Sequence, residues 1–342
     1  MTTSTTLPPA GAAAELPKVR LDWTPLALAP LLMLLAFPLV GSPSTWLTLT
    51  IAGLAMGMII FVVSSGLTLV FGLMDVLNFG HGAFIALGAY VAASVLLPLA
   101  GWVEADSLAL NLSVFALAIA AAMVAAGAVG LFFERVVVRP VYGQHLKQIL
   151  ITMGGMIVAE QLIKAIWAPE TIALQVPTTF RGAVLLGDAA IEKYRLIAMA
   201  LGLVIFIAML LLLNRTRIGL LIRAGVENRE MVEALGYRVR RLFIGVFVAG
   251  AALAGLGGVL WGLYQQNITA AIGAQVNVLI FIVIIIGGLG STTGCFVGAL
   301  LVGLMANYTG FLFPKVALFS NILLMMLILL WRPQGLFPVA RR

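Results

Sequence analysis

Long apolar runs separated by short polar segments make up most of the chain. About 20 apolar residues cross the hydrocarbon core of a bilayer, and on that measure we expect about ten membrane-spanning helices. They cover residues 24–40, 46–71, 82–99, 108–133, 149–167, 195–213, 242–263, 275–289, 295–313 and 316–331. The runs are unbroken rather than alternating, which excludes a transmembrane β-barrel. The pattern predicts an all-α polytopic membrane protein.

One boundary between spans is unusual, because polar and glycine residues interrupt the apolar sequence at FGLMDVLNFGHGAF, residues 71–84. In this segment and the two spans around it, only Asp75 and His81 have side chains that carry charge near neutral pH. An interrupted membrane helix leaves backbone N–H and C=O groups that protein or water must satisfy. Gly82 permits such a break, and Asp75, Asn78 and His81 offer partners for the freed groups. We therefore expect an interrupted helix here.

The helix that restarts near Gly82 is expected to direct its partly positive N-terminus towards the break. Transporters use such interrupted helices to bind substrate carboxylates. A second glycine-rich break, at 286–294, places Ser291 and Thr292 before another helix start. Two roles stay open for these residues: they either cap tight turns between spans or contact a substrate. Because the two breaks are similar in sequence, we also expect a duplicated architecture.

One of the two longest polar stretches, residues 214–241, carries a helical pattern. From about residue 221 to 235 it predicts an amphipathic helix of about four turns, closed by Gly236 as a C-cap. The apolar face holds Leu221, Ala224, Met231, Val232 and Leu235, and the charged face holds Arg223, Glu227 and Glu230. Helices that lie on lipid are rich in basic residues on the polar face, whereas this face is mixed in sign. The pattern favours a docking surface for a soluble partner.

Composition and charge agree with a membrane protein. Hydrophobic residues make up 62% of the chain and charged residues 10%, against about a quarter charged in soluble domains. The net charge of +7 reflects basic residues gathered on one side rather than a nucleic-acid partner. With both termini cytoplasmic, all Lys and Arg face the cytoplasm except Lys164, Arg181, Lys193, Arg195 and Lys315, as the positive-inside rule requires. Residues 1–22 are Ala-, Pro- and Thr-rich, and we expect a disordered cytoplasmic tail before a single membrane domain at 23–342.

Several kinds of chemistry are excluded. Two histidines and the single Cys295 exclude the usual zinc sites, and the chain has neither a Gly-Lys pair for a phosphate-binding loop nor a GxSxG elbow. We expect no catalytic residue, metal or cofactor. Proton-driven carriers place acids inside their spans, and only Asp75 and Glu160 lie well within apolar sequence here. Glu160 and Lys164, spaced i,i+4, either neutralise each other or line a path.

Four motifs in order resemble a known family. They are FGLMDVLNFGHGAFIALGAY (71–90), RAGVENREMVEALG (223–236), IIGGLGSTTG (285–294) and WRPQGLFP (331–338). The chain from about residue 45 onwards resembles the inner-membrane permeases of branched-chain amino-acid ABC importers, and the H-type subunit in particular. The N-terminal tail matches no part of the family pattern. Importers of urea, amides and aromatic acids share this permease type, so these solutes stay open as alternatives.

The resemblance implies a non-enzymatic permease in the bacterial inner membrane. It implies as partners a second homologous permease, two cytoplasmic ATPases that hydrolyse ATP, and a periplasmic binding protein. The ATPases are expected to dock on the coupling loop 214–241, at Arg223, Ala224, Glu227, Glu230, Ala234 and Gly236. The substrate path is expected near Asp75, Asn78, His81, Gly82, Ser291 and Thr292. An ion-coupled secondary transporter and a membrane enzyme are the alternatives from other classes.

Overall fold

The structure, a computed structural model, describes residues 24–338, so the predicted tail at 1–22 lies outside the described residues. Within this range each of the ten expected spans contains one helix. These helices are α1 (Thr24–Val40), α2 (Pro43–Met74), α3 (His81–Leu96), α5 (Leu108–Phe133), α6 (His145–Trp167), α7 (Lys193–Arg215), α10 (Val239–Gln265), α11 (Ile272–Gly287), α12 (Thr292–Leu312) and α13 (Ala317–Trp331). Six of them, α2, α5, α6, α7, α10 and α12, are long and apolar enough to cross a membrane, and the other four are shorter apolar helices.

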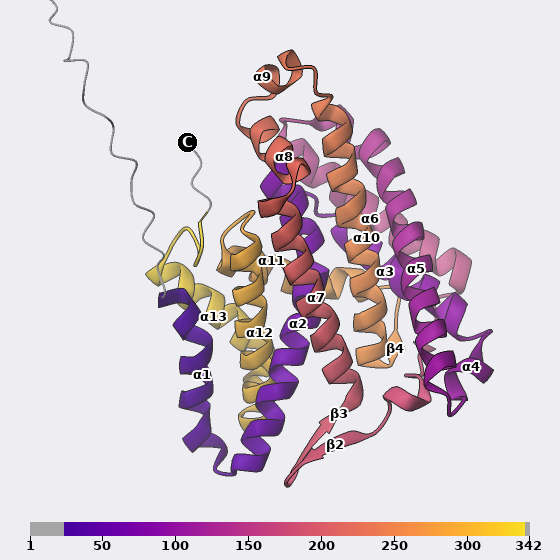
Figure 1. The fold of residues 1–342 in the computed structure, drawn as a ribbon, viewed down its shortest axis with the longest axis vertical. Coiled ribbons are helices and arrows are strands. Elements are labelled where there is room, and N and C mark those ends of the chain that lie inside the picture. Colours follow the sequence, from indigo (N-terminus) through magenta and orange to yellow (C-terminus); the bar gives the residue numbers. More distant parts are fainter. Residues whose placement is uncertain (1–23, 339–342) are drawn as a thin grey trace, which may run out of the picture.

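Short elements connect these helices at the two ends of the bundle (Figure 1). Helices α8 (Arg217–Glu227) and α9 (Arg229–Ala234) project at one end, called here the α8–α9 end. Strands β2 (Ala183–Leu186) and β3 (Ala189–Glu192) form a hairpin at the other end, called the β2–β3 end. The remaining short elements are α4 (Ala100–Glu104), η1 (Glu134–Val138), η2 (Arg139–Val141), β1 (Ile172–Ala173), η3 (Thr178–Phe180), β4 (Asn267–Ile268) and η4 (Pro314–Val316), and β1 pairs antiparallel with β4.

The two ends of the described chain lie together. Arg332, just after α13, donates a hydrogen bond from Nη2 to Oγ1 of Thr24 at the start of α1, over 2.9 Å. A chain with an even number of antiparallel spans returns to the side on which it began. The contact therefore agrees with ten spans, and the all-α polytopic fold is confirmed.

Helix α2 is the centre of the bundle, with 89% of its most apolar window buried. Its GxxxG pair faces α12: a Cβ at Gly53 would lie 2.9 Å from the Cα of Leu304, and one at Gly57 would lie 2.8 Å from the Cα of Leu300. Real Cβ atoms do not approach so closely, so only glycine permits this helix pair. Because helices in lipid gain no hydrophobic energy from association, such close packing supplies dispersion contacts in its place.

Replacing Gly57 with alanine is therefore expected to destabilise the bundle by about 1–3 kcal/mol, the usual cost of overpacking. Thermal unfolding of the detergent-purified chain measures the effect. The matched control is Gly154→Ala in α6, because a Cβ there meets no atom within 4 Å. Equal melting temperatures for the two variants would contradict the packing between α2 and α12.

Candidate functional site

The predicted break at 71–84 is present as a non-helical segment between α2 and α3. Helix α2 ends at Met74, and Asp75 follows in the left-handed conformation with φ at 53°, its N–H donating to Phe71 O. The Asp75 side chain is 45% exposed, and its Oδ2 lies 3.8 Å from Nε2 of His145. Asp75 thus lies at an exposed end of α2. Its expected role at the break and in the substrate path stays a prediction.

Side chains from two other helices satisfy the backbone of the break. Leu77 N–H donates to Gln148 Oε1 at 3.3 Å, and Phe79 N–H donates to Thr152 Oγ1 at 3.0 Å. Two residues of extended chain and four residues of helix both advance about 6–7 Å. The step from Leu77 to Phe79 therefore matches the step from Gln148 to Thr152 along α6. From α11, Asn277 Nδ2 donates to Phe79 O at 2.9 Å. The break is thus a short non-helical segment, residues 75–80, held between α6 and α11.

Asn78 and His81 hold the end of this segment that leads into α3. Asn78 Oδ1 accepts a hydrogen bond from Gly80 N–H at 3.0 Å, as expected for a residue that supports the break. The fully buried His81 lies 3.2 Å through Nε2 from Val63 O, and because a carbonyl only accepts, Nε2 is the donor. Val63 precedes the end of α2 by eleven residues, or about 16 Å of helix. Helix α3 therefore begins deep inside the bundle.

Helix α11 also begins deep in the bundle, and its N-terminus meets that of α3. A Cβ on either Gly82 or Gly273, the second residue of each helix, would overlap the carbonyl oxygen of the other. Both glycines are buried. Two partial positive charges from helix N-termini thus meet in one place. We call this contact the Gly82–Gly273 junction.

A small cavity adjoins the junction. It has a volume of about 10 Å³ and is lined by Gly82 and Gly273 and by Glu160 of α6, among others. Glu160 Oε1 accepts a hydrogen bond from Lys164 Nζ at 2.7 Å, and the two side chains are 25% and 35% exposed. A space of this size holds about one water molecule, whereas sites for small molecules measure about 300–1,000 Å³. The junction is closed in this structure.

The second predicted break, at 286–294, is also present, with φ at 98° for Gly288 and 81° for Gly290. Ser291 Oγ accepts from Gly294 N–H at 3.1 Å and so caps α12, whose first residue is Thr292. Among the described residues no hydrogen bond joins Ser291 or Thr292 to the first break. The two breaks do touch, because a Cβ at Gly72 would lie 2.6 Å from Gly290 O. Whether they belong to a duplicated architecture stays a prediction.

The terminal WRPQGLFP motif packs on this second break. Leu336 N–H donates to Ile286 O and Phe337 N–H to Gly287 O, both at 2.9 Å, which satisfies the last carbonyls of α11. A Cβ at Gly335 would lie 2.5 Å from Gly288 N. Three of the four sequence motifs, 71–90, 285–294 and 331–338, therefore meet around one end of α11.

The fourth motif, 223–236, differs from the prediction. In place of one helix the loop forms α8 and α9, which are separated at Asn228 (φ −149°, ψ 93°), whose Oδ1 accepts from Met231 N–H at 2.9 Å. The prediction of a continuous helix is wrong because Asn228 caps a new helix. Arg223, Ala224 and Glu227 lie on α8, and Glu230 and Ala234 lie on α9.

The predicted end at Gly236 is confirmed. Gly236 has φ at 86°, its N–H donates to Glu233 O, and Tyr237 N–H donates to Val232 O, which together form a Schellman motif. Ile222 and Val232 are 5% and 4% exposed, whereas Met231 and Leu235 are 61% and 70% exposed. The loop is thus held to the bundle on one face and presents large apolar side chains on another.

Comparison with known proteins decides the family. A family model described as branched-chain amino acid transport system / permease component matches residues 49–331. The chain belongs to this permease family. The family is one of transport permeases rather than enzymes, and the apolar helices agree with a multi-pass membrane protein.

Three curated relatives show how far the similarity extends. The high-affinity branched-chain amino acid transport system permease protein BraD of Pseudomonas aeruginosa is 28% identical over 293 residues, 83% of this chain and 93% of BraD. The corresponding LivH of Escherichia coli K12 is 29% identical over 300 residues, 83% of this chain and 92% of LivH. LivM of the same organism is 27% identical over 338 residues, 92% of this chain and 74% of LivM. No solved structure matches the chain.

Two residues that hold the break in this permease were missed by sequence reasoning. Neither Gln148 nor Thr152 was assigned a role from the sequence, although both are buried, with 1% and 0% of their surfaces exposed. Their i,i+4 spacing places two polar side chains on one face at the start of a membrane helix. That pattern marks the two residues as a polar pair, but it does not show which backbone groups they bind. Asn277, the third support, is a single polar residue within the predicted span 275–289.

Proposed function

We propose that the chain is a permease subunit of an ABC importer and moves branched-chain amino acids across the bacterial inner membrane. In this proposal a periplasmic binding protein delivers the amino acid, and the chain itself has no enzymatic activity. Membership of the permease family supports this assignment, as do the names of the relatives BraD and LivH.

The observation that carries the proposal is the Gly82–Gly273 junction, where the N-termini of α3 and α11 meet inside an apolar bundle. A zwitterionic amino acid brings a carboxylate, which two helix N-termini favour. It also brings an apolar side chain, which the surrounding apolar helices accept. Gly82 is the proposed point of closest approach, because the absence of a side chain exposes the backbone N–H groups there.

Asn78 and His81 are proposed to support the junction rather than to bind the amino acid. Asn78 Nδ2, His81 Nδ1 and Asn277 Oδ1 are buried without a hydrogen-bond partner among the described residues. Buried polar groups in proteins usually form hydrogen bonds, so these three atoms mark a place where water enters or where the segment at residues 75–80 moves. Asp75 at the exposed end of α2, and Ser291 and Thr292 at the second break, are proposed to hinge the two breaks.

The transport cycle requires the junction to open. The cavity beside it holds about one water molecule, so an amino acid passes only when α3, α6 and α11 move apart. We propose that two cytoplasmic ATPases drive this movement through α8 and α9, with Arg223, Ala224, Glu227, Glu230, Ala234 and Gly236 in the coupling surface. The exposed Met231 and Leu235 support a docking surface there.

A second, homologous permease is proposed to complete the path. Both LivH and LivM are similar to this chain, which supports a pair of related subunits. The α8–α9 end, with Arg135, Arg217, Arg238, Arg240 and Arg241, is proposed to be cytoplasmic by the positive-inside rule. Both termini then face the cytoplasm.

Deletion of the gene tests the solute class. A strain that lacks the chain is expected to lose uptake of labelled leucine from submicromolar solution, and the restored gene is expected to return it. Uptake of urea, of a short-chain amide and of an aromatic acid by the same cells provides the comparison. Loss of one of these with normal leucine uptake would assign the permease to that solute.

A further inference from the structure

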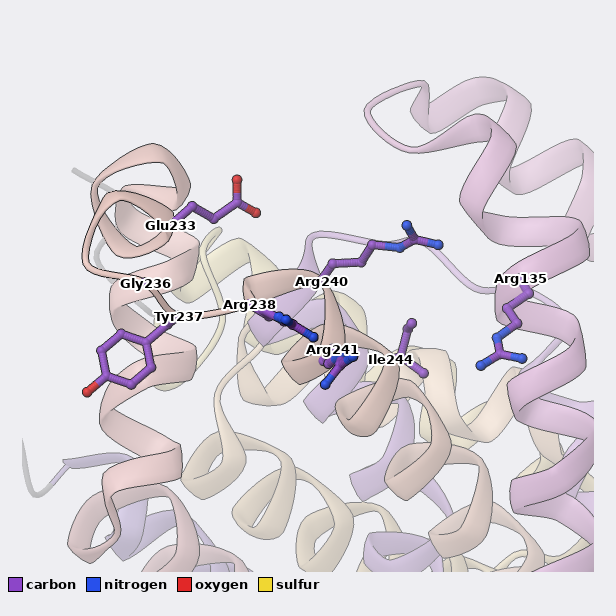
Figure 2. Close-up of a pocket in the computed structure, with 8 residues that line it drawn as sticks. All are labelled: Arg135, Glu233, Gly236, Tyr237, Arg238, Arg240, Arg241 and Ile244. Atoms are coloured by element: carbon purple, nitrogen blue, oxygen red, sulfur yellow. The ribbon is translucent and has the colours of Figure 1, made fainter.

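A second cavity, far larger than the one at the junction, lies at the α8–α9 end. It has a volume of about 600 Å³ and opens between α9, the start of α10 and η1, the π-helix that continues α5 (Figure 2). Four arginines line it: Arg135 of η1, and Arg238, Arg240 and Arg241 at the N-terminus of α10. In Figure 2, Arg240 extends from α10 into the space in front of Arg135. We call this space the arginine cavity.

The charge of the arginine cavity is poorly compensated by the residues that the structure describes. None of the four arginines forms a salt bridge with another described residue, and Glu233 is the one acid in the lining. Three of the arginines lie at a helix N-terminus, where the helix dipole disfavours positive charge. An arrangement of this kind becomes favourable when an anion occupies it.

The position of the cavity relative to the bilayer indicates which kind of anion it binds. Helices α5 and α10 contain 26 and 27 residues, or about 40 Å of helix, and a bilayer with its headgroups is about 40–45 Å thick. The arginines at the ends of these helices therefore lie at the level of lipid headgroups. Close to Arg135 in the sequence, Phe132 and Val136 are 62% and 54% exposed and offer apolar surface on the same segment of helix.

On the side that faces the middle of the bundle, α5 and α10 are in close contact. Gly130 of α5 contacts Ala251 of α10 so closely that a Cβ at Gly130 would overlap the Ala251 side chain. Nearer the α8–α9 end the rings of Phe133 of α5 and Phe247 of α10 lie 6.5 Å apart between centroids, and Ile244 forms part of the cavity lining. The result is a basic space over an apolar floor, which matches an amphiphile better than a soluble anion.

We propose that the arginine cavity binds the phosphate headgroup of an anionic phospholipid from the leaflet at the α8–α9 end. Arginine forms paired hydrogen bonds to phosphate oxygens, and basic pockets between membrane helices bind such headgroups. The acyl chains then lie along Phe132 and Val136. A bound lipid joins η1 to α9 and α10, so it fixes the position of the coupling loop. The site is separate from the Gly82–Gly273 junction and does not depend on which solute is moved.

Native mass spectrometry of the purified chain tests the proposal, with phosphatidylglycerol titrated against phosphatidylcholine. The wild-type chain is expected to retain phosphatidylglycerol preferentially, and the double variant Arg135→Gln, Arg241→Gln is expected to retain on the order of tenfold less. The matched control is Arg215→Gln with Arg217→Gln. It removes the same charge from exposed positions at the same end, outside the cavity, and is expected to behave as wild type. Because all these positions are exposed, each variant is expected to melt at the wild-type temperature.

Four results would overturn the proposal. Equal retention of the two lipids by the wild type would show no anionic site, and equal losses in the two double variants would show only general attraction to basic surface. Displacement of the lipid by millimolar inorganic phosphate would assign the cavity to a free anion. Unchanged lipid retention in the cavity variant, with loss of a co-purifying cytoplasmic subunit, would assign it to a protein partner.

Discussion

Replacing Gly82 with valine is expected to abolish leucine uptake. A side chain at this position would overlap the carbonyl oxygen of Gly273, so the N-termini of α3 and α11 would be pushed apart or their amide groups covered. Forced overlap in a packed interior costs about 1–3 kcal/mol, and the same side chain would occupy the proposed path. Uptake of labelled leucine by cells that carry the variant as their only copy measures the effect.

The control for this experiment is Gly101→Val. Gly101 is likewise the second residue of a helix, α4, but a Cβ there meets no atom within 4 Å. To separate transport from folding, the amount of each variant in the membrane and its co-purification with the cytoplasmic subunits are measured in parallel. We expect Gly82→Val to assemble without transport. Normal uptake by this variant would place the path elsewhere in the bundle.

Introducing aspartate at Met231 and Leu235 together is expected to detach the cytoplasmic ATPases. Met231 on α9 and Leu235 at its C-cap are 61% and 70% exposed, and full burial of such an apolar side chain contributes about 1.5–3 kcal/mol. Two buried carboxylates in their place would weaken binding on the order of a hundredfold. Co-purification of the ATPases with the tagged permease from detergent-solubilised membranes measures the loss.

Leu185→Asp is the matched control for the docking surface. Leu185 lies in β2 and is 71% exposed, almost the same as Leu235, but it lies at the opposite end of the molecule (Figure 1). The control is expected to retain the ATPases in full. Equal retention by the α9 variant would show that α8 and α9 do not form the docking surface.

The spans could be predicted from the sequence because hydrophobicity is a local property of each segment. Helix α5 has the predicted bounds, residues 108–133, and α1 has the predicted bounds 24–40. Lipid imposes this result, since a backbone in hydrocarbon must satisfy its own hydrogen bonds within each helix. The same reasoning found both breaks, because glycine and polar residues are the exceptions in such a sequence.

The supports of the first break could not be predicted in this way. Leu77 and Gln148, which share a hydrogen bond, are 71 residues apart, and Phe79 and Thr152 are 73 apart. Their pairing depends on how α6 is aligned beside the non-helical segment at residues 75–80. No local sequence pattern encodes that alignment. Sequence reasoning could name only the polar residues inside the segment, Asp75, Asn78 and His81, and of these Asn78 accepts a hydrogen bond from Gly80 N–H.

The loop at residues 214–241 shows the opposite error, because there a local signal in the sequence was overlooked. The amphipathic period of residues 221–235 favours one helix, but Asn228 is a strong N-cap residue and Glu230 follows in the first turn of α9. A side chain that binds the backbone competes with helix continuation. Here that competition separates α8 from α9 and leaves Met231 on a short helix, with Leu235 as its C-cap.

Reconstitution into lipid vesicles tests the central proposal, that this chain is a passive gate which separate ATPases drive. Vesicles that contain the chain with its partner permease, two ATPases and the binding protein are expected to accumulate leucine when ATP is present on the ATPase side, and to stop when ATP is withheld. Vesicles that contain this chain alone are expected to accumulate none under a proton or sodium gradient. Accumulation of leucine against its gradient by the chain alone would contradict the account.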